Sequence, residues 1–353
     1  MKDSIRIGSY LIGSDQPPFI IAEMSGNHNQ DLNRALALVD SAASSGAHAL
    51  KLQTYTADTI TLPSNNSDFT VNDPSSQWTG QSLHSLYQKA YTPWEWHKPI
   101  FDYASSKGLI CFSSPFDESA VDFLEDLDVP AYKIASFENN HLPLIRKAAS
   151  TGKPLIISTG LASLADLDLA VKTARESGCT QLILLKCTST YPASPINTNI
   201  RTIPHLSSLF DVHVGLSDHT MGIGASVAAV ALGAPIIEKH FTLSRADGGV
   251  DSSFSLEPSE LKDLVVETHR AWQSLGSISY GPTQDELSSL QFRRSIYVSS
   301  DIEIGDLFSS DNLRIVRPGF GASPQLLDQI IGVKSPKVLK AGTPLSLDKL
   351  FDS

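Results

Sequence analysis

Short apolar runs alternate with longer amphipathic segments along the chain from about residue 19 to residue 276. The eight runs are FIIAEM (19–24), HALKLQT (48–54), LICFSSP (109–115), AYKIAS (131–136), PLIISTG (154–160), QLILLKC (181–187), VHVGLSD (212–218) and PIIEKHF (235–241). Near-continuous apolar runs of this length are typical of parallel strands that are buried on both faces. Several of the intervening segments have helical periodicity and a stop signal, as in 161–178, which ends on Gly178.

Repeated strand–helix units over this length predict a TIM (β/α)8 barrel, which we expect to occupy residues 1–280. A doubly wound open α/β sheet is the alternative, because it uses the same alternation of elements. The second unit carries a long insertion between Tyr55 and Tyr91, rich in Ser, Asn, Thr, Asp and Pro. A long segment after a barrel strand lies on the catalytic face, so we expect this one to form a lid or a substrate wall.

The pattern changes after the last predicted helix. A turn-rich linker over residues 281–290 is followed by the strand-like pieces SIYVSS, IEIGD, LRIVRPGFG and VLKAGTPLS, which turns separate. Residues 291–353 therefore predict a small β-rich module, near the lower size limit for an independent core.

Composition and charge narrow the classes of partner. The chain has 353 residues, of which 41% are hydrophobic, and a net charge of −11 with no Lys/Arg run, which argues against a nucleic-acid partner. No apolar run approaches the ~20 residues needed to cross a bilayer, and the first residues lack a secretory signal, so we expect no membrane and a cytoplasmic location. The cysteines show no CxxC spacing, and Cys111 and Cys187 lie in strand-like runs, which favours a core role.

Polar residues interrupt the apolar runs mainly at their C-terminal ends. The residues at successive strand ends are Glu23; Lys51 and Gln53; Ser114; Lys133 and Ser136; Ser158; Ser189 and Tyr191; Ser217, Asp218 and His219; and Glu238, Lys239 and His240. In a TIM barrel these ends converge at the catalytic face. Serine and threonine are common wherever strands stop, but a charged side chain inside an apolar strand needs a partner or a ligand.

The residues at the strand ends fall into groups suited to metal binding, anion binding and acid–base chemistry. His219 and His240 end adjacent strands, so their imidazoles can share one divalent cation that keeps open positions. The residues suited to phosphate and carboxylate oxygens are Lys51, Lys133, Ser114, Ser136, Ser158 and Ser217. Glu23 and Asp251 are candidate acid–base groups or water-mediated metal contacts. The residues alone predict a metal-assisted barrel enzyme that acts on an anionic, phosphorylated substrate.

Several motifs resemble the N-acetylneuraminate (sialic acid) synthase family, in order and along almost the whole chain. They are IAEMSGNHNQ (21–30), ALKLQTY (49–55), YKIASFE (132–138), ISTGLAS (157–163), LLKCTSTYP (184–192), VGLSDHT (214–220) and EKHFTL (238–243). The stretches NLRIVRPGFG (312–321) and VLKAGTPLSLDKL (338–350) resemble the antifreeze-like (SAF) domain that these synthases carry.

The resemblance implies a reaction between phosphoenolpyruvate and an open-chain amino-sugar aldehyde. A divalent metal, Mn²⁺ or else Mg²⁺ or Co²⁺, polarises the aldehyde; C3 of phosphoenolpyruvate attacks it, water adds at C2, and phosphate leaves by C–O cleavage. The implied site comprises His219 and His240 for the metal; Lys51, Ser114, Lys133, Ser136, Ser158, Ser189 and Ser217 for phosphoenolpyruvate; Gln53, Glu138, Tyr191 and Arg317 around the sugar; and Glu23, Asp251 and Lys133 as catalytic groups. Arg317 matches an arginine that reaches into a partner subunit, which implies a domain-swapped homodimer.

Departures from the sialic acid pattern resemble one branch of the family. SGNHN (25–29) and ADGGVDSSFSLEP (246–258) are similar to the pseudaminic acid synthases, whose acceptor is 2,4-diacetamido-2,4,6-trideoxy-L-altrose. Ser189 stands where sialic acid synthases typically have Asn, which puts its phosphate contact in question. The N-acetylneuraminate and legionaminic acid branches are the alternatives.

Other reaction classes are also compatible with parts of the pattern. A class I aldolase would form a Schiff base on Lys51 or Lys133, and a chelator would then leave its activity intact. In a non-enzymatic role, the C-terminal module would bind ice or a glycan and the barrel would be only a scaffold. Ice binding would favour repeated Thr-type surface residues, which residues 283–353 lack. A metal-dependent hydrolase would typically gather more acidic and histidine ligands than this chain offers.

Overall fold

The structure, a computed structural model, describes residues 2–74 and 78–346. It divides into two compact units, Met1–Gly276 and Ser277–Ser353, and each is described by itself. The first unit contains a closed barrel of parallel strands, so the barrel prediction is confirmed and the open-sheet alternative is wrong. Among the described residues, no helix combines the length and the apolar composition required to cross a bilayer.

Each strand of the barrel falls within one of the apolar runs. The strands are β3 (Phe19–Glu23), β4 (Ala49–Thr54), β5 (Ile110–Pro115), β6 (Tyr132–Ile134), β7 (Leu155–Ser158), β8 (Leu182–Cys187), β9 (His213–Asp218) and β10 (Ile236–His240). Neighbours along the chain pair in parallel, and β10 pairs with β3 to close the barrel. The register sets His240 opposite Glu23 and Glu23 opposite Lys51, so charged strand ends lie side by side.

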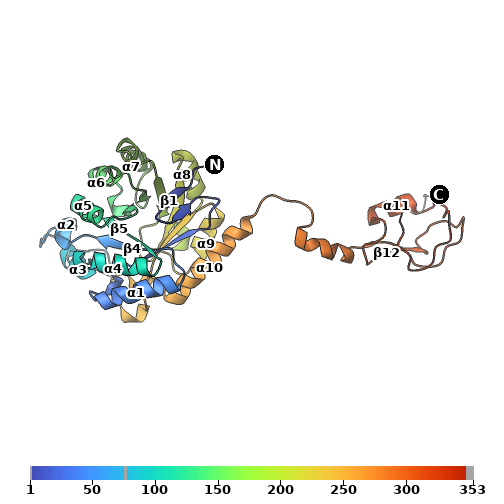
Figure 1. The fold of residues 1–353 in the computed structure, drawn as a ribbon, viewed down its shortest axis with the longest axis horizontal. Helices are drawn as coiled ribbons and strands as arrows, with labels where there is room; N and C mark the ends of the chain where they lie inside the picture. The colour runs from blue at the N-terminus through green and yellow to red at the C-terminus, as the bar shows by residue number, and fades with distance from the viewer. Residues whose placement is uncertain (1, 75–77, 347–353) are drawn as a thin grey trace. The chain divides into compact units, whose positions relative to one another are not determined.

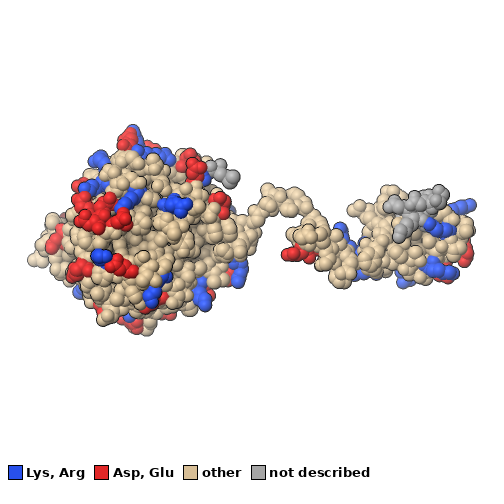
Figure 2. Space-filling view, viewed as in Figure 1, with Lys and Arg blue, Asp and Glu red and all other residues tan. Residues whose placement is uncertain are grey.

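Helices surround the strands (Figure 1). They are α1 (Leu32–Ser44), α4 (Trp94–Ser106), α5 (Glu118–Asp126), α6 (Leu142–Ala149), α7 (Leu164–Glu176), α8 (Thr202–Phe210), α9 (Gly224–Ala231) and α10 (Pro258–Leu275). The helix predicted within 161–178 is α7, which begins at a capping box formed by Ser163 and Asp166. On the face shown in Figure 2, Lys and Arg are interspersed with Asp and Glu over this unit.

Two apolar layers hold the barrel together. The outer layer lies between strands and helices and contains alternate strand residues such as Ala22, Leu216 and Ile237. The inner layer fills the lumen with residues such as Phe112 and Ile236. An unpredicted hairpin of β1 (Ile5–Ile7) and β2 (Tyr10–Ile12) packs its isoleucines into this inner layer, and lumen-facing apolar side chains thus give way to charged ones only toward the strand C-termini.

The insertion after β4 is more ordered than its composition predicts. It contains α2 (Ala57–Ile60), the 3-10 turn η2 (Ser67–Phe69) and α3 (Leu83–Ala90) among its described residues, and residues 75–77 lie outside them. Ser82 caps α3 by accepting a hydrogen bond from the backbone N–H of Ser85. Leu86 and Ala90 are buried, so α3 contributes an apolar face that the polar composition of the segment conceals.

The second unit has a small core of its own, formed by Ile296, Val298, Ile302, Phe308, Leu313, Ile330, Leu339 and Leu345. Strands β11 (Ser295–Val298) and β12 (Leu313–Val316) pair antiparallel, and α11 (Leu327–Ile330) packs nearby. The pieces IEIGD and VLKAGTPLS are not strands, because turns at Gly305 and Gly342 interrupt them. A single bridge joins Ile302 to Leu339 between the two pieces, and another joins Pro344 to Tyr297 of β11. A 3-10 helix, η7 (Gln284–Phe292), occupies much of the expected linker, and residues 347–350 of the last quoted motif lie outside the described residues.

The barrel lumen makes one glycine sensitive to substitution. A Cβ on Gly215 of β9 would lie 2.2 Å from both Cγ2 and the carbonyl oxygen of Ile236 on β10. We expect Gly215→Ala to lower the free energy of unfolding by about 1–3 kcal/mol, because a neighbouring strand backbone cannot yield. Gly224→Ala is the matched control, since its Cβ would meet no atom within 4 Å. Urea unfolding curves check this, and equal midpoints for the two variants would contradict it.

Candidate active site

A cavity of about 450 Å³ opens at the C-terminal ends of the barrel strands. Its lining contains charged, hydroxyl and imidazole side chains together with aromatic residues from the insertion. The predicted site residues that line it are Glu23, Lys51, Gln53, Lys133, Ser136, Glu138, Ser158, Ser189, Tyr191, Ser217, His219, His240 and Asp251. Residues that are far apart in sequence thus meet in one concave space.

Four buried charges form the floor of this cavity. Lys51 Nζ lies 2.5 Å from Glu23 Oε2 and 3.8 Å from Glu238 Oε2. Lys133 Nζ lies 3.0 Å from Glu238 Oε1. Each of these side chains comes from a different strand, and each residue is at most 4% exposed. The two ammonium groups and the two carboxylates balance one another, as buried charges must.

Hydroxyl and amide groups complete the hydrogen bonding of the four charges. Ser114 Oγ accepts from Lys51 Nζ at 3.1 Å, so Ser114 supports the floor although it does not line the cavity. Ser217 Oγ donates to Glu238 Oε1 at 2.9 Å, and Gln53 Nε2 donates to Glu23 Oε1 at 2.9 Å. Beyond their ion pairs with Lys51, Glu23 Oε2 and Glu238 Oε2 accept no further hydrogen bond from the described residues.

The charges shift one another's proton affinity. Burial raises the pKa of Glu23 to about 6, against the opposing effect of the Lys51 ammonium. Burial by itself would lower the pKa of Lys51, but the carboxylates of Glu23 and Glu238 hold it above its ordinary value. Burial disfavours ionised Glu238, yet Lys133 and Lys51 bring its pKa well below the usual range. The floor therefore keeps Lys51 cationic and leaves Glu23 as a carboxyl that gains a proton close to neutral pH.

Serine hydroxyls border the charged floor on one side. Ser158 Oγ is buried without a hydrogen-bond partner, and Ser136 Oγ accepts from the backbone N–H of Gly160 at 3.2 Å. A Cβ on Gly160 would lie 2.1 Å from Ser189 Oγ and 2.6 Å from Ser136 Oγ. Glycine at this position thus allows the segment after β7 to approach both hydroxyls closely.

The two predicted metal ligands lie close together in the same cavity. The ring centroids of His219 and His240 are 5.2 Å apart. His219 Nδ1 lies 3.0 Å from the carbonyl oxygen of Thr188. This contact orients the ring and leaves Nε2 as the nitrogen that could bind a metal. Among the described residues, the buried His240 Nδ1 has no hydrogen-bond partner, and it lies 3.9 Å from Asp251 Oδ2.

These residues fit a divalent cation with open coordination positions. Burial and the nearby His219 lower the pKa of His240 well below its ordinary value, which keeps its imidazole neutral, as a metal ligand requires. Within residues 2–74 and 78–346, no group of three or more His, Cys, Asp or Glu residues is placed to hold a metal. Two imidazoles, with the Asp251 carboxylate near His240, would hold a divalent cation and leave some of its coordination positions open for water or a substrate oxygen.

Aromatic residues cover the imidazoles. The Tyr191 ring lies 4.5 Å from the His219 ring, and Phe254 lies 5.0 Å from the His240 ring, between ring centroids. The insertion adds an apolar wall to the cavity, made of Ile60, Val71, Leu83, Leu86 and Ala90. The cavity thus has one charged, polar end and one apolar side, which suits a substrate that carries both anionic and methyl groups.

Arg317 belongs to the second unit. It follows β12 directly and its side chain is exposed. The bond between Arg317 and Pro318 is cis.

Comparison with known proteins gives the family. The model of the NeuB family matches residues 38–280, more than half of the chain, and the model of the SAF domain matches residues 293–350. The chain belongs to the NeuB family. The resemblance predicted from the motifs is thereby confirmed, as is the prediction of a barrel followed by an antifreeze-like module.

Relatives and solved structures agree with this family. A pseudaminic acid synthase of Campylobacter jejuni is 42% identical over 97% of this chain and 98% of its own length. An N,N'-diacetyllegionaminic acid synthase of Legionella pneumophila is 38% identical over 94% of each chain. A crystal structure of N-acetylneuraminic acid synthetase from Leptospira borgpetersenii in complex with citrate has a TM-score of 0.73 and 33% identity, and covers 83% of this chain and 97% of the other.

Two residues of this NeuB-family site received no role from the sequence. Glu238 was seen only as a polar strand end, yet it contacts both floor lysines. Its position two residues before His240 on one strand was the available signal, because alternate strand residues share a face. Cys187 was interpreted as a core residue; it is buried, but it lines the cavity, with Sγ 3.8 Å from His219 Nδ1. Cys111 does lie in the outer apolar layer.

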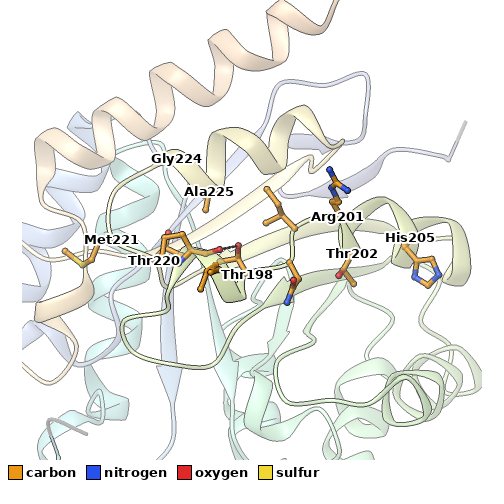
Figure 3. Close-up of a pocket in the computed structure, with 12 residues that line it drawn as sticks. Thr198, Arg201, Thr202, His205, Thr220, Met221, Gly224 and Ala225 are labelled. Atoms are coloured by element: carbon orange, nitrogen blue, oxygen red, sulfur yellow. Dashed lines mark hydrogen bonds between the residues drawn. The ribbon is translucent and has the colours of Figure 1, made fainter. Parts of the chain in front are cut away.

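A second hollow, of about 910 Å³, lies outside the catalytic cavity of the NeuB-family barrel. Figure 3 shows Arg201, Thr202 and His205 on one side of it, and Met221, Gly224 and Ala225 on the other. Its lining includes none of the four floor charges and neither of the two histidines that we predict as metal ligands. We therefore place the chemistry in the smaller cavity at the barrel mouth.

Glu138 makes stability depend on pH. Burial raises its pKa from 4.5 to about 7, and its Oε2 makes no hydrogen bond. The folded protein therefore binds a proton that the unfolded chain releases, and the unfolding free energy falls as pH rises from about 4.5 to 7. In the Glu138→Gln variant we expect the decrease in unfolding free energy over this pH range to be smaller by at least about 1 kcal/mol, because glutamine does not bind the proton.

Urea unfolding at pH 5, 6, 7 and 8 measures the effect of Glu138→Gln. The exposed Glu176→Gln removes an equal charge from the end of α7 and serves as the control. A difference between parent and Glu138→Gln that stays constant across this range would contradict the assignment.

Proposed function

We propose that this chain is a pseudaminic acid synthase. It condenses phosphoenolpyruvate with 2,4-diacetamido-2,4,6-trideoxy-L-altrose, in its open-chain aldehyde form, and yields pseudaminic acid and phosphate. The observation that carries the proposal is the paired-lysine floor beside two imidazoles in one cavity at the barrel mouth. Full-length similarity to a protein named pseudaminic acid synthase supports the choice of branch.

Phosphoenolpyruvate binds over the floor lysines in this proposal. Lys51 and Lys133 supply positive charge for its phosphate and carboxylate oxygens. The hydroxyls of Ser136, Ser158 and Ser189 line the same cavity, and Ser158 Oγ has no hydrogen-bond partner among the described residues that it would have to give up. Ser114 and Ser217 act indirectly, since they hold Lys51 and Glu238 in place.

Glu23 is suited to move a proton during condensation. Its pKa of about 6 lets it exist in both protonation states near neutral pH, and it faces the cavity between Lys51 and Gln53. An arriving anion adds negative charge beside it and favours the protonated form. C3 of phosphoenolpyruvate forms the new bond to the aldehyde carbon, water adds at C2, and the C–O bond to phosphate breaks.

His219 and His240 would hold the divalent metal, for which we propose Mn²⁺, with Mg²⁺ or Co²⁺ as alternatives. The metal supplies Lewis-acid polarisation of the aldehyde oxygen when it is bound. Asp251 lies near His240 and accepts a hydrogen bond from Ser25 Oγ, so its carboxylate is held in position. Tyr191 packs on His219 and limits access of water to that side.

The sugar occupies the remainder of the cavity. Gln53, Glu138, Tyr191 and Asp251 offer polar contacts to it, and the insertion wall offers an apolar surface for a C6 methyl and for acetamido methyl groups. A C6 hydroxyl would lie against that wall without a partner, which disfavours N-acetylmannosamine. Arg317 of a second subunit completes the sugar site in a domain-swapped homodimer, as the family resemblance implies.

The Schiff-base alternative is less consistent with this site. A lysine attacks a carbonyl only as the neutral amine, yet Lys51 is held cationic by two carboxylates. Lys133 likewise pairs with Glu238. A class I aldolase mechanism would also not use the imidazoles of His219 and His240, because it needs no metal.

The purified protein tests the proposal when it is mixed with phosphoenolpyruvate, Mn²⁺ and either the diacetamido-trideoxy-altrose or N-acetylmannosamine. We expect phosphate release and a product of the mass of pseudaminic acid with the trideoxy sugar alone, and loss of both with EDTA. His240→Ala should abolish this activity and leave the barrel folded. Turnover of N-acetylmannosamine instead would overturn the substrate, and EDTA-resistant turnover would overturn the metal-dependent mechanism.

A further inference from the structure

A buried ion pair lies behind the two imidazoles, on the outer side of the barrel wall. Asp218 Oδ2 and Lys239 Nζ are 2.8 Å apart, and both residues are at most 2% exposed. They are register partners on the adjacent strands β9 and β10. The pair does not line the catalytic cavity, and no step of the proposed reaction uses it.

The alternation of strand residues connects this pair to the metal ligands. Leu216 and Ile237, two residues before each charge, belong to the outer apolar layer, so Asp218 and Lys239 also point toward the helices. The next residues along the chain are His219, directly after β9, and His240, the last residue of β10, and both line the cavity on the opposite side of the barrel wall. One ion pair therefore ties together the two backbone positions that precede both imidazoles.

Further hydrogen bonds hold the backbone on the far side of His219. Asp218 Oδ1 accepts from the backbone N–H of Thr220 at 2.9 Å, and Lys239 Nζ donates to the carbonyl oxygen of Thr220 at 2.5 Å. Ser226 of α9 donates to Asp218 Oδ2 at 2.7 Å. Beyond Thr220 the chain runs into the turn at Met221, which is 49% exposed and borders the outer hollow in Figure 3.

Net stability is a poor explanation for charges at this location. Two buried charges lose their hydration, so a pair of apolar residues of similar volume is commonly as stable or more stable. Much of the neighbouring outer layer is apolar, although Ser226 and the backbone of Thr220 would lose their polar partners in such a pair. What an apolar pair cannot supply is the set of directed bonds that fix residues 218, 220 and 239 relative to one another.

We infer that the Asp218–Lys239 ion pair is a positioning device for the metal site. It sets the separation and the orientation of His219 and His240 by fixing the strand ends that carry them. Asp218 and Lys239 are thus positioning residues that act through the imidazoles. The inference rests on the proposed function, because it takes these two imidazoles as the metal ligands.

Co²⁺ binding to the full-length protein tests this inference without any turnover. The variants are Asp218→Asn, Lys239→Met and the double variant, which removes both charges and leaves none unpaired in the outer layer. The control is the double variant Asp122→Asn with Lys147→Met, which removes a surface pair between α5 and α6. Visible absorption of bound Co²⁺ reports the affinity and the ligand geometry, and thermal unfolding reports the fold.

We expect the Asp218/Lys239 double variant to remain folded, to bind Co²⁺ at least about tenfold more weakly, and to give an altered absorption spectrum. The control should match the parent in Co²⁺ affinity and in absorption spectrum. A double variant that has the parent's affinity and spectrum, whatever its melting temperature, would overturn the inference and leave the proposed function intact. A parent protein whose Co²⁺ binding is unchanged by His219→Ala would instead overturn the metal site itself, and this inference with it.

Discussion

The site depends on the pairing of four charges inside an apolar barrel. Lys51 and Lys133 cannot remain ionised in the lumen unless anions lie beside them, and Glu23 and Glu238 provide these anions in the ligand-free protein. The same lysines are the groups that an anionic substrate needs. A phosphate and a carboxylate that arrive from solution therefore meet two lysines that are already ionised and held in place by their carboxylate partners.

The rest of the barrel is arranged around this constraint. The lumen below the charges is filled with apolar side chains and closed by the β1–β2 hairpin, so the charged floor faces open space only at the strand C-termini. The imidazoles, the serine hydroxyls and the apolar wall from the insertion line the same cavity as the charged floor. In the proposed function the lysines and serines bind phosphoenolpyruvate, the imidazoles bind the metal, and the wall contacts the sugar.

Periodicity and chemistry predicted much of this from the sequence. Eight apolar runs gave the barrel, because buried parallel strands are nearly continuous in apolar residues. Glu23, Lys51 and Lys133 were predicted as site residues because they are charged residues within apolar runs, and a buried charge needs a partner or a ligand. The branch of the family and the role of Arg317 came from resemblance alone, and no rule of spacing would have supplied them.

Other features depend on three-dimensional neighbours that no local pattern encodes. Glu238 contacts two lysines from strands more than a hundred residues away, so its importance is visible only once the barrel closes. The apolar face of α3 was hidden in a polar segment, and the outward direction of Asp218 and Lys239 follows from the register of β9 and β10. The β1–β2 hairpin is too short to carry a periodic signal.

The most direct measurement is a crystal structure of the protein soaked with phosphoenolpyruvate and Mn²⁺, with anomalous data at the manganese edge. We expect an anomalous peak shared by the imidazoles of His219 and His240, and phosphoenolpyruvate oxygens in contact with Lys51 and Lys133. Phosphoenolpyruvate bound away from both lysines, or manganese bound away from both histidines, would contradict it.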